Sequence, residues 1–114
     1  MDISFKNKRL QKEFQEGKTL LRIHGEKRAK KIMARMQALR AANSLGDFWP
    51  PFFGPERCHE LTGNRKGKLS MDLDHPYRLI IGPDHSPLPV KPDGGLDWKL
   101  VTAVMVFGVE DTHE

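Results

Sequence analysis

RCHELTGNRKGKLSMDLDHPYRLII, residues 57–81, is the stretch that decides the fold, because it holds three short strand-like runs separated by turns. Residues 57–63 alternate between apolar and polar side chains, and GNRKG then supplies glycine and asparagine for a turn. KLSMDLD, residues 68–74, alternates cleanly, with its leucines and methionine on one face. The dipeptide HP marks a second turn before YRLIIG at 77–82. The stretch predicts neighbouring antiparallel strands.

Periodicity on either side of this stretch predicts the remaining elements. ISFKN at 3–7 indicates a first strand, and KRLQKEFQEG at 8–17 indicates a short helix that stops near its glycine. Residues 26–45 predict a longer amphipathic helix, and the β-branched run at 100–109 predicts a central strand buried on both faces. The apolar stripe of the longer helix consists of Ala29, Ile32, Met33, Met36 and Leu39.

This order of elements predicts an α+β fold. An N-terminal strand and two helices would pack on one face of a small, mainly antiparallel sheet of four or five strands. The 114 residues suit a single domain, 1–114, in which the Pro/Gly-rich stretch 82–99 is a long loop. One cysteine, Cys58, excludes an internal disulfide, and no apolar run reaches the roughly 20 residues of a membrane helix. We expect a cytoplasmic protein with no membrane contact.

The positive charge is concentrated in the first part of the chain. Residues 1–40 carry 12 Lys and Arg against 4 Asp and Glu, although the net charge of the whole chain is only +4. Lys27, Lys31 and Arg35 are spaced to share the polar face of the longer helix. Such a face suits RNA or an acidic protein, and we assign these three residues as RNA contacts. The alternative is a solvated basic face without a partner.

Aromatic side chains crowd the segment GDFWPPFFGPE at 46–56. Pro50 and Pro51 exclude a regular helix interior or a central strand there. Two interpretations stay open, since the aromatic side chains could close one end of the core or bind a partner. The residues concerned are Phe48, Trp49, Phe52 and Phe53.

Polar side chains from several expected strands suit the cleavage of RNA. When the 2′-hydroxyl of RNA attacks the adjacent phosphate, the reaction needs a proton acceptor, a proton donor and cations, but no metal ion or other cofactor. His59 and His113 are candidates for proton transfer, since imidazole titrates near neutral pH. Arg78 can hold a phosphate with two hydrogen bonds, and Lys66 adds a point charge.

Ordinary structural roles are the alternative for the same residues. His59 could be a hydrogen-bonded strand histidine, and Arg78 could pair with Asp72 or Glu60 across the sheet. His113 could be an unstructured tail residue. Cys58 and His59 are adjacent on a strand and face opposite ways, so they cannot form a simple nucleophile and base pair. With one cysteine and scattered histidines, no zinc site is expected.

The stretch 57–81 resembles the segment shared by HigB-type toxins of the RelE/ParE superfamily, the plasmid-maintenance killer proteins. The resemblance lies in HELTG at 59–63, KG at 66–67, Ser70, YRL at 77–79 and the C-terminal VEDTH at 109–113. SFKNKRLQKEF and the helix after residue 25 also match the opening of the family. Thr112 stands where the family usually has a tyrosine, and Leu69 where it usually has an aromatic residue.

The resemblance implies a RelE-like fold and a toxin of a type II toxin–antitoxin pair. Members of the HigB type cut mRNA on the translating ribosome, and a HigA-like helix-turn-helix antitoxin silences them. By position, the implied active-site region holds His59, Lys66, Arg78, Asp111 and His113, and we add Arg65 and Lys68 at the turn as RNA contacts. Two alternatives remain: a ParE-like poison of DNA gyrase, and a non-catalytic binding module of the killer-suppressor kind.

Overall fold

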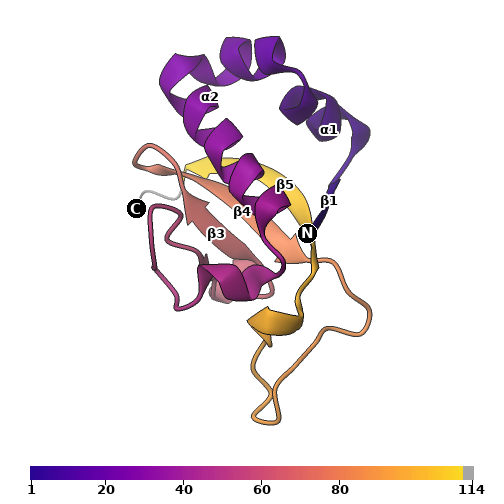
Figure 1. Cartoon of the computed structure of the whole chain (residues 1–114). Coiled ribbons are helices and arrows are strands. Elements are labelled where there is room, and N and C mark those ends of the chain that lie inside the picture. The colour runs from indigo at the N-terminus through magenta and orange to yellow at the C-terminus, as the bar shows by residue number, and fades with distance from the viewer. Residues whose placement is uncertain (112–114) are drawn as a thin grey trace.

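Two helices and five strands follow one another in the computed structural model, which describes residues 1–111. In chain order they are β1 (Asp2–Phe5), α1 (Lys8–Gln15), α2 (Gly17–Ala41), β2 (His59–Glu60), β3 (Leu69–Asp72), β4 (Tyr77–Pro83) and β5 (Ala103–Asp111). Short 3₁₀ turns occur at Leu45–Phe48, Gly63–Arg65 and Trp98–Leu100. The helices form one layer and the sheet the other, as Figure 1 shows. The expected α+β class is confirmed.

The five strands form one mixed sheet in the order β1-β5-β4-β3-β2. β1 runs parallel to β5, with Ile3 opposite Val104, and the other neighbours are antiparallel. The expectation that residues 100–109 are buried on both faces is wrong, because β5 alternates between buried and half-buried positions. The continuous buried run belongs to β4, the middle strand of the sheet, from Leu79 to Gly82.

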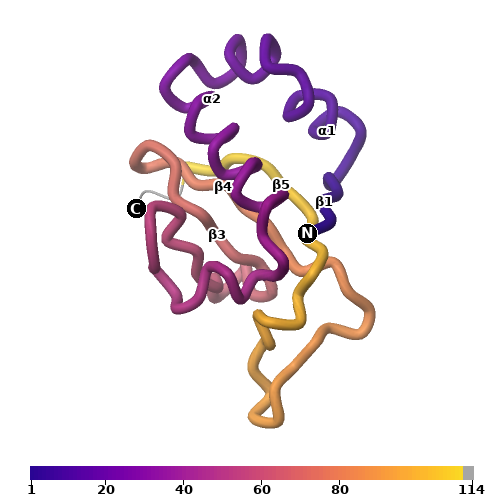
Figure 2. The backbone as a smooth tube through the Cα atoms, in the orientation of Figure 1, coloured from indigo at the N-terminus to yellow at the C-terminus, as the bar shows by residue number. Residues whose placement is uncertain are grey.

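The helical segment is longer than its periodicity indicates. α1 begins where the Asn7 side chain accepts a hydrogen bond from the Leu10 amide at 2.8 Å, and it ends before Gly17 as expected. α2 then starts at once at Gly17 and is broken at Gly25, whose φ of 80° is non-helical. The expected helix from residue 26 is therefore the second part of α2. Figure 2 shows the change of direction between its two parts.

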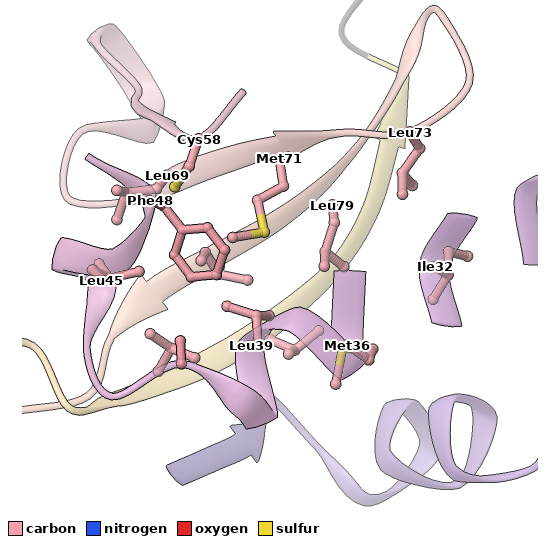
Figure 3. Packing of buried hydrophobic residues seen from close by; sticks show 14 of the residues in the cluster. Ile32, Met36, Leu39, Leu45, Phe48, Cys58, Leu69, Met71, Leu73 and Leu79 are labelled. Carbon is pink, nitrogen blue, oxygen red and sulfur yellow. The ribbon is translucent and has the colours of Figure 1, made fainter. Parts of the chain in front are cut away.

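The core lies between α2 and one face of the sheet. In Figure 3, Ile32, Met36 and Leu39 of α2 point toward the strand residues Met71 and Leu79. Met33 departs from the predicted stripe, since 44% of its surface is exposed. Phe48 is only 6% exposed and closes the end of this core, so for this residue the first interpretation is confirmed and the partner contact is wrong. A buried ring cannot reach a partner.

Arg35 also lies inside the protein. Its Nε donates to the Asp72 carbonyl at 2.7 Å, and its Nη2 donates to the Pro55 carbonyl at 3.1 Å. The side chain is 8% exposed. The assignment of Arg35 as an RNA contact is therefore wrong, because its guanidinium joins α2 to β3 and to the segment 46–56.

The expected long loop leaves the sheet after Pro83 and returns at Ala103. It extends away from the helices and the sheet in Figure 2. A bridge between Val90 and Leu96 and a hydrogen bond of 2.7 Å from the Lys91 amide to the Gly95 carbonyl fold it back on itself. Within residues 1–111 no helix has the length and apolar character needed to cross a membrane.

Candidate active site

The face of the sheet turned away from α2 carries the predicted site. His59 of β2 stands opposite Ser70 of β3, and Asp72 of β3 stands opposite Arg78 of β4. Side chains alternate along a strand, so Ser70 and Asp72 point away from the core face that Leu69 and Met71 occupy. Three short strands thus bring a histidine, a hydroxyl, a carboxylate and an arginine together.

His59 has its two ring nitrogens in different surroundings. Nδ1 lies 3.0 Å from the Arg57 carbonyl, which can only accept, so we assign the ring proton to Nδ1. Nε2 then carries the lone pair, and it lies 3.4 Å from Nη1 of Arg78 and 3.3 Å from Oγ of Ser70. Because a guanidinium can only donate, this contact agrees with the same tautomer. Nε2 is therefore a proton acceptor that faces a cation.

Asp72 holds two arginines beside this histidine. Its Oδ1 lies 3.4 Å from Nε of Arg78, and its Oδ2 lies 3.2 Å from Nε of Arg57. Both guanidiniums keep contact with water, since the Arg57 side chain is 52% exposed and that of Arg78 is 33% exposed. A shared carboxylate fixes their positions, and their remaining N–H groups suit a phosphate oxygen. Arg57 was not among the candidates from the sequence.

The aromatic loop, residues 48–57, reaches the same cluster. Phe52 stacks on the His59 ring with 4.1 Å between centroids and 20° between planes. The Phe52 amide donates to the Cys58 carbonyl at 3.0 Å, which ties the loop to the start of β2. The guanidinium carbon of Arg57 lies 5.1 Å from the centre of the Phe52 ring. Phe52 is therefore part of the site's surroundings.

The turn between β2 and β3 adds further positive charge. Arg65 pairs with Glu110 of β5, with 2.6 Å between Nη2 and Oε1. Nζ of Lys68 lies 4.4 Å from the centre of the Phe107 ring. Lys66 is exposed and lines a groove of about 530 Å³ between this turn and the long loop, together with Lys68. These three residues form a basic edge beside the cluster.

Comparison with solved structures finds chains of the same shape. One is in the "YoeB-YefM complex from Staphylococcus aureus", at 15% identity with a TM-score of 0.53. A second is in the "heterotetrameric complex of YoeB-YefM toxin-antitoxin from Staphylococcus aureus", at 16% identity with a TM-score of 0.50. Each alignment covers 100% of this chain and 98% of the other. The chain has a RelE-like fold. A scan against protein-family models gives no match, and a comparison with curated proteins gives no significant match.

Within this RelE-like fold, the C-terminal candidates are Asp111 and His113. Asp111 is the last residue of β5 and stands opposite Tyr77, one position beyond the pair of Glu110 and Arg78. Asp111 therefore lies at the same end of the sheet as Arg78, but it shares the core-side face of Tyr77 and Val109, and Glu110 is the β5 residue on the face of Arg78. His113 lies outside the described residues.

The basic residues of α2 lie apart from this cluster. Lys27 is exposed and Lys31 half-buried on the helix that covers the opposite face of the sheet. Their neighbour Arg28 stacks 3.4 Å from the centre of the Tyr77 ring and pairs with Asp74. Any RNA contact by Lys27 and Lys31 would therefore be separate from the site around His59.

Cys58 is a core residue, as expected, and not a nucleophile. It is fully buried, and burial, reinforced by Glu56 and Glu60, raises the pKa of its thiol to about 12. The thiol therefore stays protonated near neutral pH. Among residues 1–111 no group of three or more His, Cys, Asp or Glu is arranged to hold a metal ion.

Proposed function

We propose that this chain is the toxin of a type II toxin–antitoxin pair and that it cuts mRNA on the translating ribosome. The RelE-like fold supports the first part, because the similar chains come from YoeB-YefM toxin–antitoxin complexes. The second part depends mainly on one contact, between the unprotonated Nε2 of His59 and the Arg78 guanidinium. A base and a phosphate-binding cation in contact are what cleavage of RNA by its own 2′-hydroxyl requires.

His59 is the proton acceptor in this proposal. Nε2 takes the proton of the 2′-hydroxyl while the 2′ oxygen forms a bond to phosphorus, and the bond between phosphorus and the 5′ oxygen breaks. The 5′ oxygen receives a proton from a second group, for which His113 remains the predicted donor, with Asp111 close to it along the chain. The products are a cyclic phosphate on one fragment and a free 5′-hydroxyl on the other.

Arg78 and Arg57 would hold the phosphate. Their common partner Asp72 keeps both guanidiniums on the same side of the sheet, so one phosphate can contact both. Negative charge grows on the non-bridging oxygens in the transition state, and the two cations would stabilise it. Lys66, Lys68 and Arg65 at the neighbouring turn would contact the adjoining backbone of the RNA. Lys27 and Lys31 would add a separate contact to ribosomal RNA.

The proposed partner is an antitoxin, expected from the family resemblance to be a HigA-like helix-turn-helix protein. The HigB-type assignment stays a prediction, since the similar structures are complexes of YoeB with YefM.

Controlled expression of the wild type and of Arg78→Ala tests the proposed function. We expect the wild type to arrest growth and to produce new 5′ ends in translated transcripts, and Arg78→Ala to do neither. Arg22→Ala is the matched control, because Arg22 is an exposed arginine on α2. Circular dichroism of both variants would establish that they fold.

Two results would contradict the proposed function. One is growth arrest by Arg78→Ala as strong as by the wild type, which would remove Arg78 from the mechanism. The other is DNA damage with intact transcripts, which would indicate a gyrase poison instead.

A further inference from the structure

Three large aromatic side chains stay half exposed in the aromatic loop. The exposed fractions are 49% for Trp49, 48% for Phe52 and 57% for Phe53. A small protein that exposes several large aromatic rings in one loop usually binds something there. The chemistry around two of these rings indicates what it binds.

The Phe52 ring lies between two groups of the candidate active site. His59 stacks on the ring, and the Arg57 guanidinium lies over it at 5.1 Å from the ring centre while sharing Asp72 with Arg78. A planar group that stacks on the exposed part of the Phe52 ring would therefore lie close to the guanidiniums of Arg57 and Arg78. A nucleobase with its attached phosphate matches this arrangement, because every base has an apolar face next to a negative charge.

The backbone is strained at the two residues that create this arrangement. Within residues 1–111, Phe52 and Arg57 are the non-glycine residues with positive φ, at 67° and 46°. This region is costly for bulky side chains and persists where the surrounding contacts impose it, which happens often at binding sites. The stacking of Phe52 on His59 and the pairing of Arg57 with Asp72 are among the contacts that hold this backbone in place.

Trp49 repeats the combination of an aromatic ring and a cation. Its ring packs edge-on against the buried Trp98, with 5.1 Å between centroids and 89° between planes. Nζ of Lys91, from the long loop, lies 5.6 Å from the centre of the Trp49 ring. Trp49, Lys91 and Lys99 line a hollow of about 340 Å³. Surfaces that bind single-stranded nucleic acid combine aromatic rings for the bases with cations for the backbone.

We propose that Phe52 and Trp49 stack the bases of single-stranded RNA, while Arg57 and Lys91 contact its phosphates. This inference rests on the proposed function, since it describes the strand whose cleaved phosphate lies at Arg78. The sequence left the partner of the aromatic loop open, and this inference specifies it as RNA. A protein partner on these rings is the competing outcome of the test.

The test measures binding of a labelled, uncleavable RNA, a single-stranded 2′-O-methyl oligonucleotide, by fluorescence anisotropy in low salt. We expect Phe52→Ala and Trp49→Ala each to weaken binding at least about fivefold, and Phe52→Tyr to bind like the wild type. The matched control is Phe53→Ala, because Phe53 is the more exposed neighbour and no ring or cation contact involves it within the described chain.

The salt dependence of RNA affinity separates the contribution of base stacking from that of charge. Removing the Phe52 ring should leave the slope of log affinity against log salt unchanged, whereas Arg57→Ala should reduce it by about 0.7. Thermal unfolding of each variant would show that the substitutions in the aromatic loop leave the protein folded.

The inference is overturned if Phe52→Ala and Phe53→Ala bind RNA equally well, or if the wild type binds no RNA in low salt. It is also overturned if Phe52→Ala binds RNA normally but loses a protein partner. These outcomes differ from a failure of the proposed function, in which Arg78→Ala stays toxic whatever the RNA affinity.

Discussion

Replacing Arg35 by methionine separates the two roles that this residue could have. If Arg35 contacted RNA at the surface, the substitution would lower the affinity of the protein for RNA and leave its stability unchanged. The structure instead gives Arg35 two hydrogen bonds to backbone carbonyls, of Asp72 at 2.7 Å and of Pro55 at 3.1 Å. Methionine keeps the unbranched aliphatic part of the side chain and removes both bonds.

The expected loss of stability follows from these two bonds. A hydrogen bond from a charged donor contributes about 1.5–3 kcal/mol, and we take the lower value because water can reach the freed carbonyls at the edge of the loop. Two bonds then give about 3 kcal/mol. For a chain of this size roughly 4 °C is lost per kcal/mol, so we expect the melting temperature to fall by about 12 °C.

Thermal unfolding followed by circular dichroism measures this effect, and Lys31→Met is the control. Lys31 is on the same helix but half-buried and outside the core. We therefore expect the Lys31→Met substitution to lower the melting temperature by roughly 2 °C at most. Equal melting temperatures for Arg35→Met and the wild type would refute the reasoning, since the two carbonyl contacts would then contribute nothing.

Three further predictions follow from the site and the core. Asp72→Asn removes the charge that holds Arg57 and Arg78 together, so we expect cleavage of reporter transcripts in translating cells to fall about 10- to 100-fold. The melting temperature should fall by only a few degrees, because the pairs are partly exposed, and unchanged cleavage would contradict this account. The thiol of Cys58 should react with Ellman's reagent at pH 8 only after unfolding, and fast reaction of the native protein would contradict its burial. Folding raises the pKa of this thiol from about 9 to about 12. Its contribution to the free energy of unfolding is therefore complete below pH 9 and is lost as the pH rises toward 12. Denaturant titrations at several pH values would show this loss.

The alternation and spacing of apolar residues determined much of the fold. Alternation in 68–74 placed Leu69, Met71 and Leu73 on the inner face, and all three are buried in the core. The spacing of Ile32, Met36 and Leu39 likewise identified the helix face that meets the sheet. These predictions succeed because each depends only on the period of one element, which the local sequence carries.

The position of an element among its neighbours was decided only by the tertiary structure. The run at 100–109 is strongly apolar, yet β5 is fully buried on only one face, and the continuous buried run belongs to β4. The charge of Arg35 predicts a surface residue, but its guanidinium donates hydrogen bonds to the backbone carbonyls of Asp72 and Pro55. A local pattern cannot show which distant backbone groups will need a donor.

The candidate site divides in the same way. Residue chemistry predicted a proton-transfer role for His59 and a phosphate-binding role for Arg78, and strand pairing brings the two side chains into contact. Arg57 and the Phe52 ring join them from the aromatic loop, whose backbone has positive φ angles at these two residues. Local sequence determined which groups face outward from the sheet. The distant contacts that fix the aromatic loop determined which of those groups meet.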